Sequence, residues 1–169
     1  MAEAYLLPHL VDELIILKHT SMTEAIKNLL SKKEGQCWLV KFAPFRTSWT
    51  DIVRRGTFTL RSVRNPQARN NIAAMQIGDI VLLYHSQQEL AIVGIMEVTR
   101  QAYPDPTSPD PQWLTCDFRP VLTLSRPVTL AEIKEESALE NLLLVRQPRV
   151  AVMPVSKEEL LIINRMAST

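Results

Sequence analysis

The arginines of this chain are segregated along the sequence. No acidic residue lies between Asp51 and Asp79, yet this stretch carries Arg54, Arg55, Arg61, Arg64 and Arg69. Arg146 and Arg149 form a second, smaller group. A guanidinium donates paired hydrogen bonds to phosphate oxygens and base edges, so the pattern indicates a local anion-binding surface. The alternative is a solvated face that the acidic segment 132–140 neutralises.

Carboxamide side chains crowd the same stretch of the chain. They are Asn65, Gln67, Asn70 and Asn71. An amide carries a donor and an acceptor side by side, which suits the edge of a nucleobase. A helix that begins here would add backbone N–H groups that favour an anion. Capping of that helix also explains Asn65 without any ligand.

The tripeptide Tyr84-His85-Ser86 could be catalytic if His85 acted as the base for Ser86 or Cys37. However, the chain has no Gly-x-Ser-x-Gly elbow, and neighbours on a strand point to opposite faces. A hydrogen-bonded, buried His85 and a Tyr84 that stacks on a planar ligand are therefore favoured, and no catalytic residue is predicted.

Metal and cofactor motifs are missing from the sequence. His9 and His19 lack the spacing of metal ligands. The chain has 4 glycines, none in a Gly-x-Gly pair, which excludes a dinucleotide fingerprint or a P-loop. We therefore expect no metal and no cofactor.

Composition limits the class of protein. The 169 residues carry 19 Lys and Arg against 18 Asp and Glu, a net charge of +1, which excludes bulk polybasic attraction to nucleic acid. Cys37 and Cys116 form neither a disulfide framework nor a zinc site and indicate a reducing compartment. No apolar run reaches the roughly 20 residues that cross a bilayer. Because the N-terminus also lacks a signal-peptide pattern, we expect a soluble intracellular protein that does not enter a membrane.

The pattern of the chain changes after residue 36. Residues 1–36 have apolar side chains at helical spacing and a capping box at Ser21 and Glu24, which predict two short helices. Beyond them, β-rich runs predict strands at 37–42, 57–63, 79–85, 90–99, 113–124 and near 150–155. Capping residues predict helices after Ser48, Asn65, Thr129 and Ser156, the third interrupted near Ser137.

The order of these elements indicates the fold class. The proline-rich segment 103–111 is expected to be a surface loop. The remaining short strands do not alternate regularly with long helices, so a doubly wound parallel sheet is not expected. The sequence predicts an α+β domain.

The segment Val63-Arg-Asn-Pro-Gln-Ala-Arg-Asn70 resembles the signature of the EVE domain. Further segments match the same pattern in order: 38–41 with Pro44, 78–79, 84–86, 94–95, 102–107, 127–130, 144–147 and 152–155. The resemblance runs from Cys37 to Val155 and leaves residues 1–36 outside it.

The resemblance implies a PUA-like fold for residues 37–169, preceded by the N-terminal helical extension at 1–36. Such a fold is a bent, mixed β-barrel of five to six strands with short peripheral helices, similar to YTH and ASCH domains. It also implies a nucleic-acid partner, because EVE and YTH modules are associated with modified bases held in a pocket. Such a pocket stacks a flipped base on aromatic rings and reads its edge with polar groups.

The resemblance assigns ligand-binding roles by position. Asn65 and Tyr84 are expected to contact the base, and Arg64, Arg69 and Arg146 to bind phosphate or form structural pairs. The other ligand-binding candidates are Lys41, Phe42, Gln67, Asn70, His85, Ser86, Gln147 and Met153.

This chain departs from the family pattern at several of these positions. Phe42-Ala43 stands where Ser-Glu is usual, and Leu60 where a tryptophan is usual. Pro66 and Pro148 replace a tyrosine and a serine. These changes remove an aromatic wall and small polar groups, so either Phe42 or Phe45 provides the stacking ring or the ligand differs.

Three functions are compatible with the sequence. The leading hypothesis is a non-enzymatic domain that binds a nucleobase, modified or not, in RNA or DNA. The alternative is a divergent EVE domain with an eroded pocket that recruits a protein partner through the helices of residues 1–36. The third is an enzyme that acts on a nucleotide or a nucleic acid through His85 or Cys37. We expect a cytoplasmic location in a bacterium, or a nuclear one in a eukaryote.

Overall fold

The fold is built on a mixed sheet. The computed structural model describes Ser31 and residues 36–169. In this part of the chain the strands are β1 Cys37–Phe42, β2 Phe58–Thr59, β3 Ile80–His85, β4 Ala91–Pro104, β5 Leu114–Thr129 and β6 Val152–Val155. They pair in the order β2-β5-β4-β3-β1-β6. Only β1 and β3 are parallel to each other; the other pairs are antiparallel.

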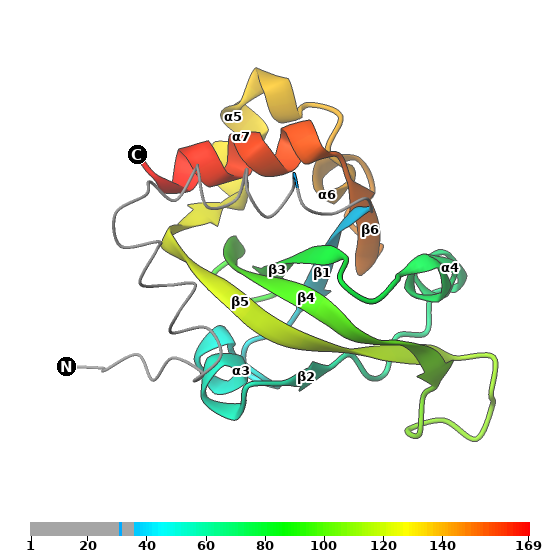
Figure 1. Ribbon diagram of the computed structural model, residues 1–169. Coiled ribbons are helices and arrows are strands. Elements are labelled where there is room, and N and C mark those ends of the chain that lie inside the picture. The colour runs from blue at the N-terminus through cyan, green and yellow to red at the C-terminus, as the bar shows by residue number, and fades with distance from the viewer. Residues whose placement is uncertain (1–30, 32–35) are drawn as a thin grey trace.

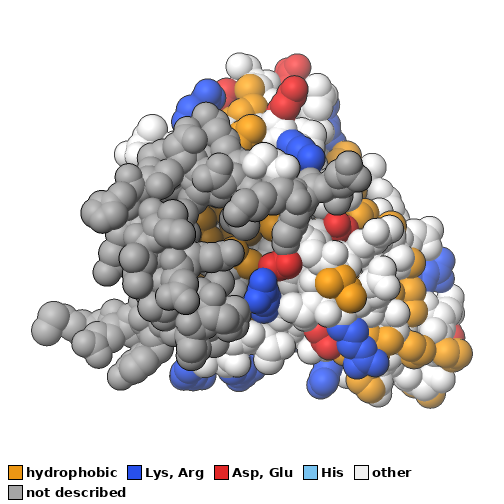
Figure 2. Space-filling model, viewed as in Figure 1, with side chains coloured by type: hydrophobic (Ala, Val, Ile, Leu, Met, Phe, Trp, Pro, Cys, Tyr) orange, Lys and Arg blue, Asp and Glu red, His pale blue; other side chains and the backbone are white. Residues whose placement is uncertain are grey.

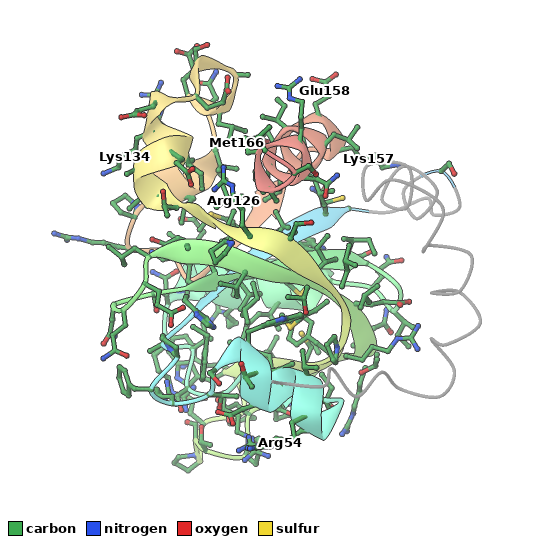
Figure 3. The ribbon with its side chains drawn as sticks, turned by 90° about the vertical axis from the view of Figure 1, so that its left-hand side faces the viewer. Arg54, Arg126, Lys134, Lys157, Glu158 and Met166 are labelled. Atoms are coloured by element: carbon green, nitrogen blue, oxygen red, sulfur yellow. The ribbon has the colours of Figure 1, made fainter. Side chains whose placement is uncertain are left out.

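Short helices cover both faces of this sheet. They are α3 Trp49–Arg55, α4 Pro66–Ala74, α5 Leu130–Glu135, the 3₁₀ helix η2 Ser137–Leu139, α6 Leu143–Arg146 and α7 Lys157–Ala167. In Figure 1, α5 and α7 lie on one side of the sheet and α3 on the other. Figure 3 shows the same division from the side, with Lys134 and Met166 above the sheet and Arg54 below it. The two helices predicted within residues 1–36 lie outside the described residues.

Alternation along β1 explains why there are two cores. Cys37 and Leu39 point into a cluster that includes side chains of α5, α6 and α7. Trp38 and Val40 point into a second cluster, which includes side chains of α3 and α4. Successive residues of a strand face opposite sides, so a nearly continuous apolar strand is needed to fill both clusters.

The sheet is strongly curved. Phe58 of β2 and Phe42 of β1 are in edge-to-face contact, with 5.0 Å between ring centroids. The strand order separates β2 from β1 by four spacings, about 19 Å if the sheet were flat. The pairing of β4 with β5 shifts register at several places between Ile92 and Tyr103, and such bulges bend strands. The sheet therefore curls until its first and fifth strands meet.

Local sequence signals locate most of the elements correctly. Ser48 forms the predicted capping box with Asp51, and Gly56 ends α3 in the left-handed conformation. Asn65 caps α4, whose first residue is Pro66. Thr129 with Glu132 and Ser156 with Glu159 form capping boxes for α5 and α7.

Three strand predictions were wrong in their extent. The strand predicted over 57–63 is reduced to Phe58–Thr59, because Ser62 has a φ of 67° and turns the chain away from the sheet. Conversely, β4 continues to Pro104, so the start of the predicted proline loop is strand. At its other end β5 continues to Thr129, beyond the predicted end at residue 124. On its outer edge β5 pairs only with the short β2, and prolines are tolerated at such an edge.

Among the described residues, no helix combines the length and apolar character needed to span a bilayer. Both cysteines are free thiols and buried. Burial raises the pKa of Cys116 to about 12. Its Sγ lies 3.6 Å from the sulfur of Met75, so Cys116 makes a packing contact in the core.

We predict that Gly94→Ala destabilises the fold through one contact. A Cβ at position 94 would overlap the six-membered ring of Trp49, which packs directly against the glycine. Overpacking of this kind costs about 1–3 kcal/mol in the free energy of unfolding. Urea denaturation measures the effect.

The matched background is Trp49→Phe, which removes most of the overlapping ring atoms. In that background Gly94→Ala should cost clearly less, so the double-mutant cycle should give a coupling energy of about 1 kcal/mol or more. Equal costs in both backgrounds would contradict the proposed overlap.

Candidate functional site

A pocket opens where the parallel strands β1 and β3 end. Its volume is about 380 Å³, and it is lined by Lys41, Tyr84, Ser86, Gln87, Leu90, Leu130, Arg149 and Ala151. Ligand pockets commonly measure 300–1,000 Å³. The lining comes from β1, β3, the β3–β4 turn, the first turn of α5 and the segment before β6.

The parallel register of β1 and β3 positions the first two of these side chains. Lys41 is paired with Tyr84, and Phe42 with His85. Paired residues share a face of the sheet, and the next pair lies on the opposite face. Lys41 and Tyr84 therefore reach the pocket together, whereas Phe42 and His85 point to the other side of the sheet.

The pocket combines two cations with a free hydroxyl. Burial lowers the pKa of Lys41, whose ammonium group donates a hydrogen bond to the carbonyl oxygen of Pro148. Within residues 36–169 no carboxylate lies at ion-pair distance from Lys41 or Arg149. Burial raises the pKa of Tyr84, so its hydroxyl stays protonated, and no described group hydrogen-bonds to it. Such a site can hold an anion next to a planar polar group.

The turn that forms one wall of the pocket is conformationally strained. Gln87, Glu89 and Leu90 all have positive φ, at 66°, 67° and 43°. Non-glycine residues adopt such angles only when surrounding contacts hold them, at a cost on the order of 1–3 kcal/mol each. Here the Ser86 amide donates to the Phe42 carbonyl and the Leu130 amide donates to the Leu90 carbonyl. These two bonds fix the wall to β1 and α5.

His85 is a structural residue in this arrangement. Its Nε2 accepts a hydrogen bond from the Trp49 amide at 3.1 Å, and its Nδ1 lies 2.7 Å from a carboxylate oxygen of Glu89. The side chain is 4% exposed. With both ring nitrogens occupied, His85 connects the first turn of α3 to the strained turn.

The two members of the hypothetical Cys37–His85 pair are far apart. Cys37 pairs with Ile80 at the start of the two parallel strands, whereas His85 is at their end. Five residues of strand span about 16 Å. Burial also raises the pKa of Cys37, which disfavours the thiolate needed for nucleophilic attack. The structure does not bring this pair together.

The other residues predicted to bind a ligand are distributed over the molecule. Lys41, Tyr84 and Ser86 line the pocket. Phe42 is buried against Phe58, and Met153 is fully buried in the core next to α7. Neither Phe42 nor Met153 presents a surface to a ligand.

The helix α4 and its neighbours hold the predicted amides and Arg69. The Asn65 side chain accepts from the Ala68 amide as the helix cap. Gln67 donates to Gln147 at 2.6 Å. The Arg69 guanidinium donates to Gln112 and Asn70 and lies over the ring of Trp113. On a separate element, Arg146 donates to the carbonyl of Glu140.

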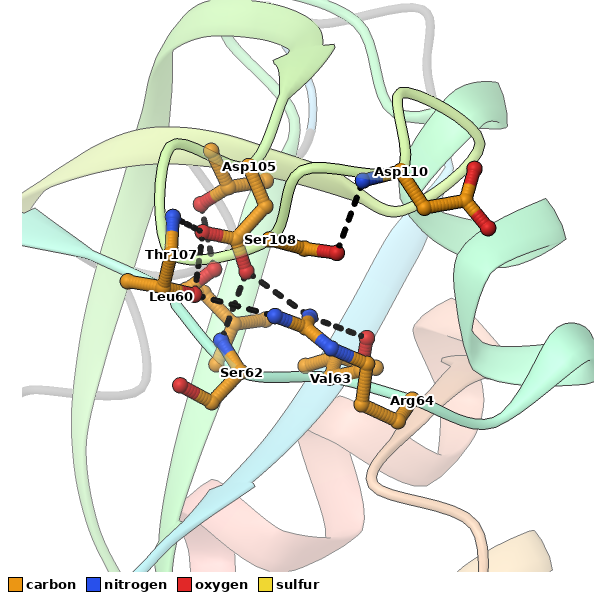
Figure 4. Close-up of polar contacts among 9 residues, drawn as sticks. Leu60, Ser62, Val63, Arg64, Asp105, Thr107, Ser108 and Asp110 are labelled. Carbon is orange, nitrogen blue, oxygen red and sulfur yellow. Dashed lines mark hydrogen bonds and ion pairs between the residues drawn. The ribbon is translucent and has the colours of Figure 1, made fainter.

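Arg64 belongs to a buried network around Asp105 (Figure 4). Its Nη1 lies 2.9 Å from Asp105, whose carboxylate is fully buried. The Ser62 amide and the amide and hydroxyl of Thr107 also donate to this carboxylate. Burial alone would raise the pKa of Asp105, but these hydrogen bonds outweigh it and hold the pKa well below its usual range. Arg64 is therefore a structural partner that locks the turn into α4.

Several pocket residues were missed from the sequence. Arg149 carried a signal, because it belongs to the second arginine group. Gln87, Leu90 and Leu130 carried none, since their residue types are common in turns and helix starts. Across residues 36–169 there is also no group of three or more His, Cys, Asp or Glu side chains that could hold a metal ion.

The curled mixed sheet, the helices on its two faces and the pocket at the end of its parallel strands define a PUA-like fold, as predicted. Residues 36–166 match the model of the EVE domain. The chain belongs to the EVE domain family, which confirms the resemblance noted in its sequence.

Several relatives support this assignment. Thymocyte nuclear protein 1 from Homo sapiens is 29% identical over 171 residues, covering 84% of this chain and 76% of that protein. A crystal structure of an Agrobacterium tumefaciens protein is 40% identical, with a TM-score of 0.77 over 79% of this chain and 93% of that one. The crystal structure of human THYN1 protein in complex with 5-methylcytosine-containing DNA is 27% identical. Its TM-score is 0.72, over 80% of this chain and 99% of that one.

We predict that Asp105→Asn reduces both stability and its pH dependence. The pKa of Asp105 is lower in the folded than in the unfolded chain, so its ionised form stabilises the fold above the unfolded-state pKa of about 3.9. That stabilisation is lost as the pH falls toward the folded-state pKa. The variant should lose about 2 kcal/mol at neutral pH and show a flatter decline between about pH 5 and pH 2. Urea denaturation across this pH range provides the measurement.

Glu135→Gln is the control, because Glu135 is an exposed carboxylate of α5 that forms no hydrogen bond or ion pair within the described residues. It should change the free energy of unfolding little at any pH. An Asp105→Asn variant with the pH profile of the wild type would show that the network does not stabilise the fold.

Proposed function

We propose that this protein is a non-enzymatic nucleic-acid-binding domain that holds a nucleobase, modified or not, in the pocket at the ends of β1 and β3. The base would come from a single strand or be flipped out of a duplex, because a stacked and paired base cannot enter a pocket. This is the leading hypothesis of the sequence analysis, and we assign its binding site to this pocket.

One relative supports a nucleic-acid ligand. Human THYN1 protein, whose structure is similar to 80% of this chain, has been crystallised with 5-methylcytosine-containing DNA. Family membership alone does not specify a ligand, since function depends on the site rather than the fold. The proposal therefore depends on the pocket itself.

The observation that carries the proposal is the convergence of Lys41, Arg149 and the Tyr84 hydroxyl in one pocket. The two cations have no acidic partner among the described residues, so an anion entering the pocket would not displace an existing ion pair. Tyr84 is only 2% exposed, but it lines the pocket and its hydroxyl has no hydrogen-bond partner among the described residues, so we assign it a hydrogen bond to the edge of the bound base. Leu90 and Leu130 provide apolar surface for the faces of a planar ring.

The distribution of charge supports a local rather than a diffuse interaction. On the face shown in Figure 2, lysine and arginine side chains are scattered and alternate with acidic ones. Arg54, Arg64 and Arg119 are paired with Asp51, Asp105 and Glu97. With a net charge of +1, attraction to nucleic acid must come from a few unpaired cations such as those of the pocket.

The assignment as non-enzymatic has a geometric basis. Both ring nitrogens of His85 are engaged by Trp49 and Glu89, and the Cys37 thiol is buried at the opposite end of β1. The pocket contains Ser86, and no hydrogen bond joins its hydroxyl to Lys41 or Tyr84 in the described structure. These groups favour binding over chemistry.

Variants of the pocket should separate base contacts from phosphate contacts. In titrations with short single-stranded oligonucleotides at several salt concentrations, Lys41→Gln and Arg149→Gln should weaken binding. Each should also lower the salt slope by about 0.7 to 0.9, the effect of one lost phosphate contact. Tyr84→Phe should weaken binding about 3- to 10-fold through the loss of one hydrogen bond, with an unchanged slope. The panel includes cytosine, 5-methylcytosine and 5-hydroxymethylcytosine.

Arg100→Gln is the matched control for the cations. Arg100 is exposed on β4, ten residues from Leu90 and therefore about 30 Å from the pocket along the strand. It should leave affinity and slope nearly unchanged. Pocket variants that all bind as the wild type does, or a wild type that binds no oligonucleotide, would refute the proposed site.

A further inference from the structure

The turn that follows β1 presents an aromatic ring to solvent. Phe45 is 63% exposed, among the most exposed large hydrophobic side chains of the described chain. The turn is ordered by hydrogen bonds from the amides of Arg46 and Thr47 to the carbonyl of Ala43. It continues directly into the Ser48 cap of α3. The Phe45 ring is therefore exposed to solvent on a turn whose backbone is fixed by hydrogen bonds.

This turn is attached to the wall of the pocket. Lys41 lines the pocket, and the next residue, Phe42, accepts a hydrogen bond from the amide of Ser86, which also lines it. Phe45 follows Phe42 by three residues, so their Cα atoms are no more than about 11 Å apart. Phe45 is therefore within reach of a nucleotide strand that leaves the pocket past the end of β1.

The neighbouring side chain is suited to a polyanion. The Arg46 guanidinium lies 4.8 Å from the centroid of the Phe42 ring, which fixes its position at the end of β1. Within the described residues no carboxylate pairs with it. An aromatic ring beside an unpaired arginine is the combination that single-stranded nucleic acid requires, a stacking surface with a phosphate contact.

We infer that Phe45 stacks on the base adjacent to the one in the pocket and that Arg46 contacts the connecting phosphate. The inference rests on the proposed function, and it extends the site from one nucleotide to at least two. It also identifies the stacking ring of this chain. Phe42, the other candidate, is 8% exposed and packs against Phe58.

The test compares ligands of different length. Phe45→Ala should weaken binding of a single-stranded tetranucleotide about 5- to 100-fold, the effect of losing one base–aromatic stack. It should leave binding of a mononucleotide carrying the preferred base unchanged. Phe45→Trp should restore or exceed the affinity for the tetranucleotide. Arg46→Gln should lower the salt slope for the tetranucleotide by about 0.7.

Ile77→Ala is the matched control. Ile77 is 65% exposed, and it precedes β3 at the opposite end of the β1–β3 pair, whose strands are about 16 Å long. This variant should bind the tetranucleotide and the mononucleotide with the affinity of the wild type. If Phe45→Ala binds the tetranucleotide as well as the wild type does while the Lys41 and Tyr84 variants lose affinity, the stacking role is wrong and the pocket remains. If the wild type binds neither ligand, both proposals fail.

Discussion

The contact between Phe42 and Phe58 is the constraint on which the rest of the fold depends. The two rings belong to strands that are four positions apart in the sheet, yet their centroids are 5.0 Å apart. This contact, extended by the stacking of Phe58 on Phe118, holds the curled sheet closed around one apolar cluster. The opposite face of β1 and β3, which carries Lys41 and Tyr84, then lies next to the start of α5 and the segment before β6. The pocket exists because the sheet is curled.

The departures from the family pattern can be understood from this closure. Phe42, Ala43 and Leu60 are all buried, and Phe42 and Leu60 belong to the cluster that closes the sheet. Pro66 begins α4, and the carbonyl of Pro148 accepts the hydrogen bond that orients Lys41. Several substitutions that looked like losses from a pocket therefore add apolar volume to the interior or position a pocket side chain. They do not empty the pocket that the structure contains.

A buried carboxylate decides which cations can bind a ligand. Asp105 holds Arg64 and the amide of Ser62, and through them the turn that leads into α4. Arg69 is engaged by Gln112, Asn70 and the ring of Trp113. These arginines were prominent in the sequence, but their guanidinium groups bind residues of the loop that joins β4 to β5. Arg149 and Arg46, less prominent in the sequence, remain available to a polyanion.

The sequence by itself determined the α+β class, the family and most helix starts. Capping pairs such as Ser48 with Asp51 are only three residues apart, so they can be recognised from the local sequence. It also predicted ligand-binding roles for Lys41, Tyr84 and Ser86, which line the same pocket in the structure. Only the tertiary structure decided that Phe42 and His85 face away from that site and that Leu90 and Leu130 line it. Those outcomes depend on the β1–β3 register and the curl of the sheet, which are contacts between residues far apart in sequence.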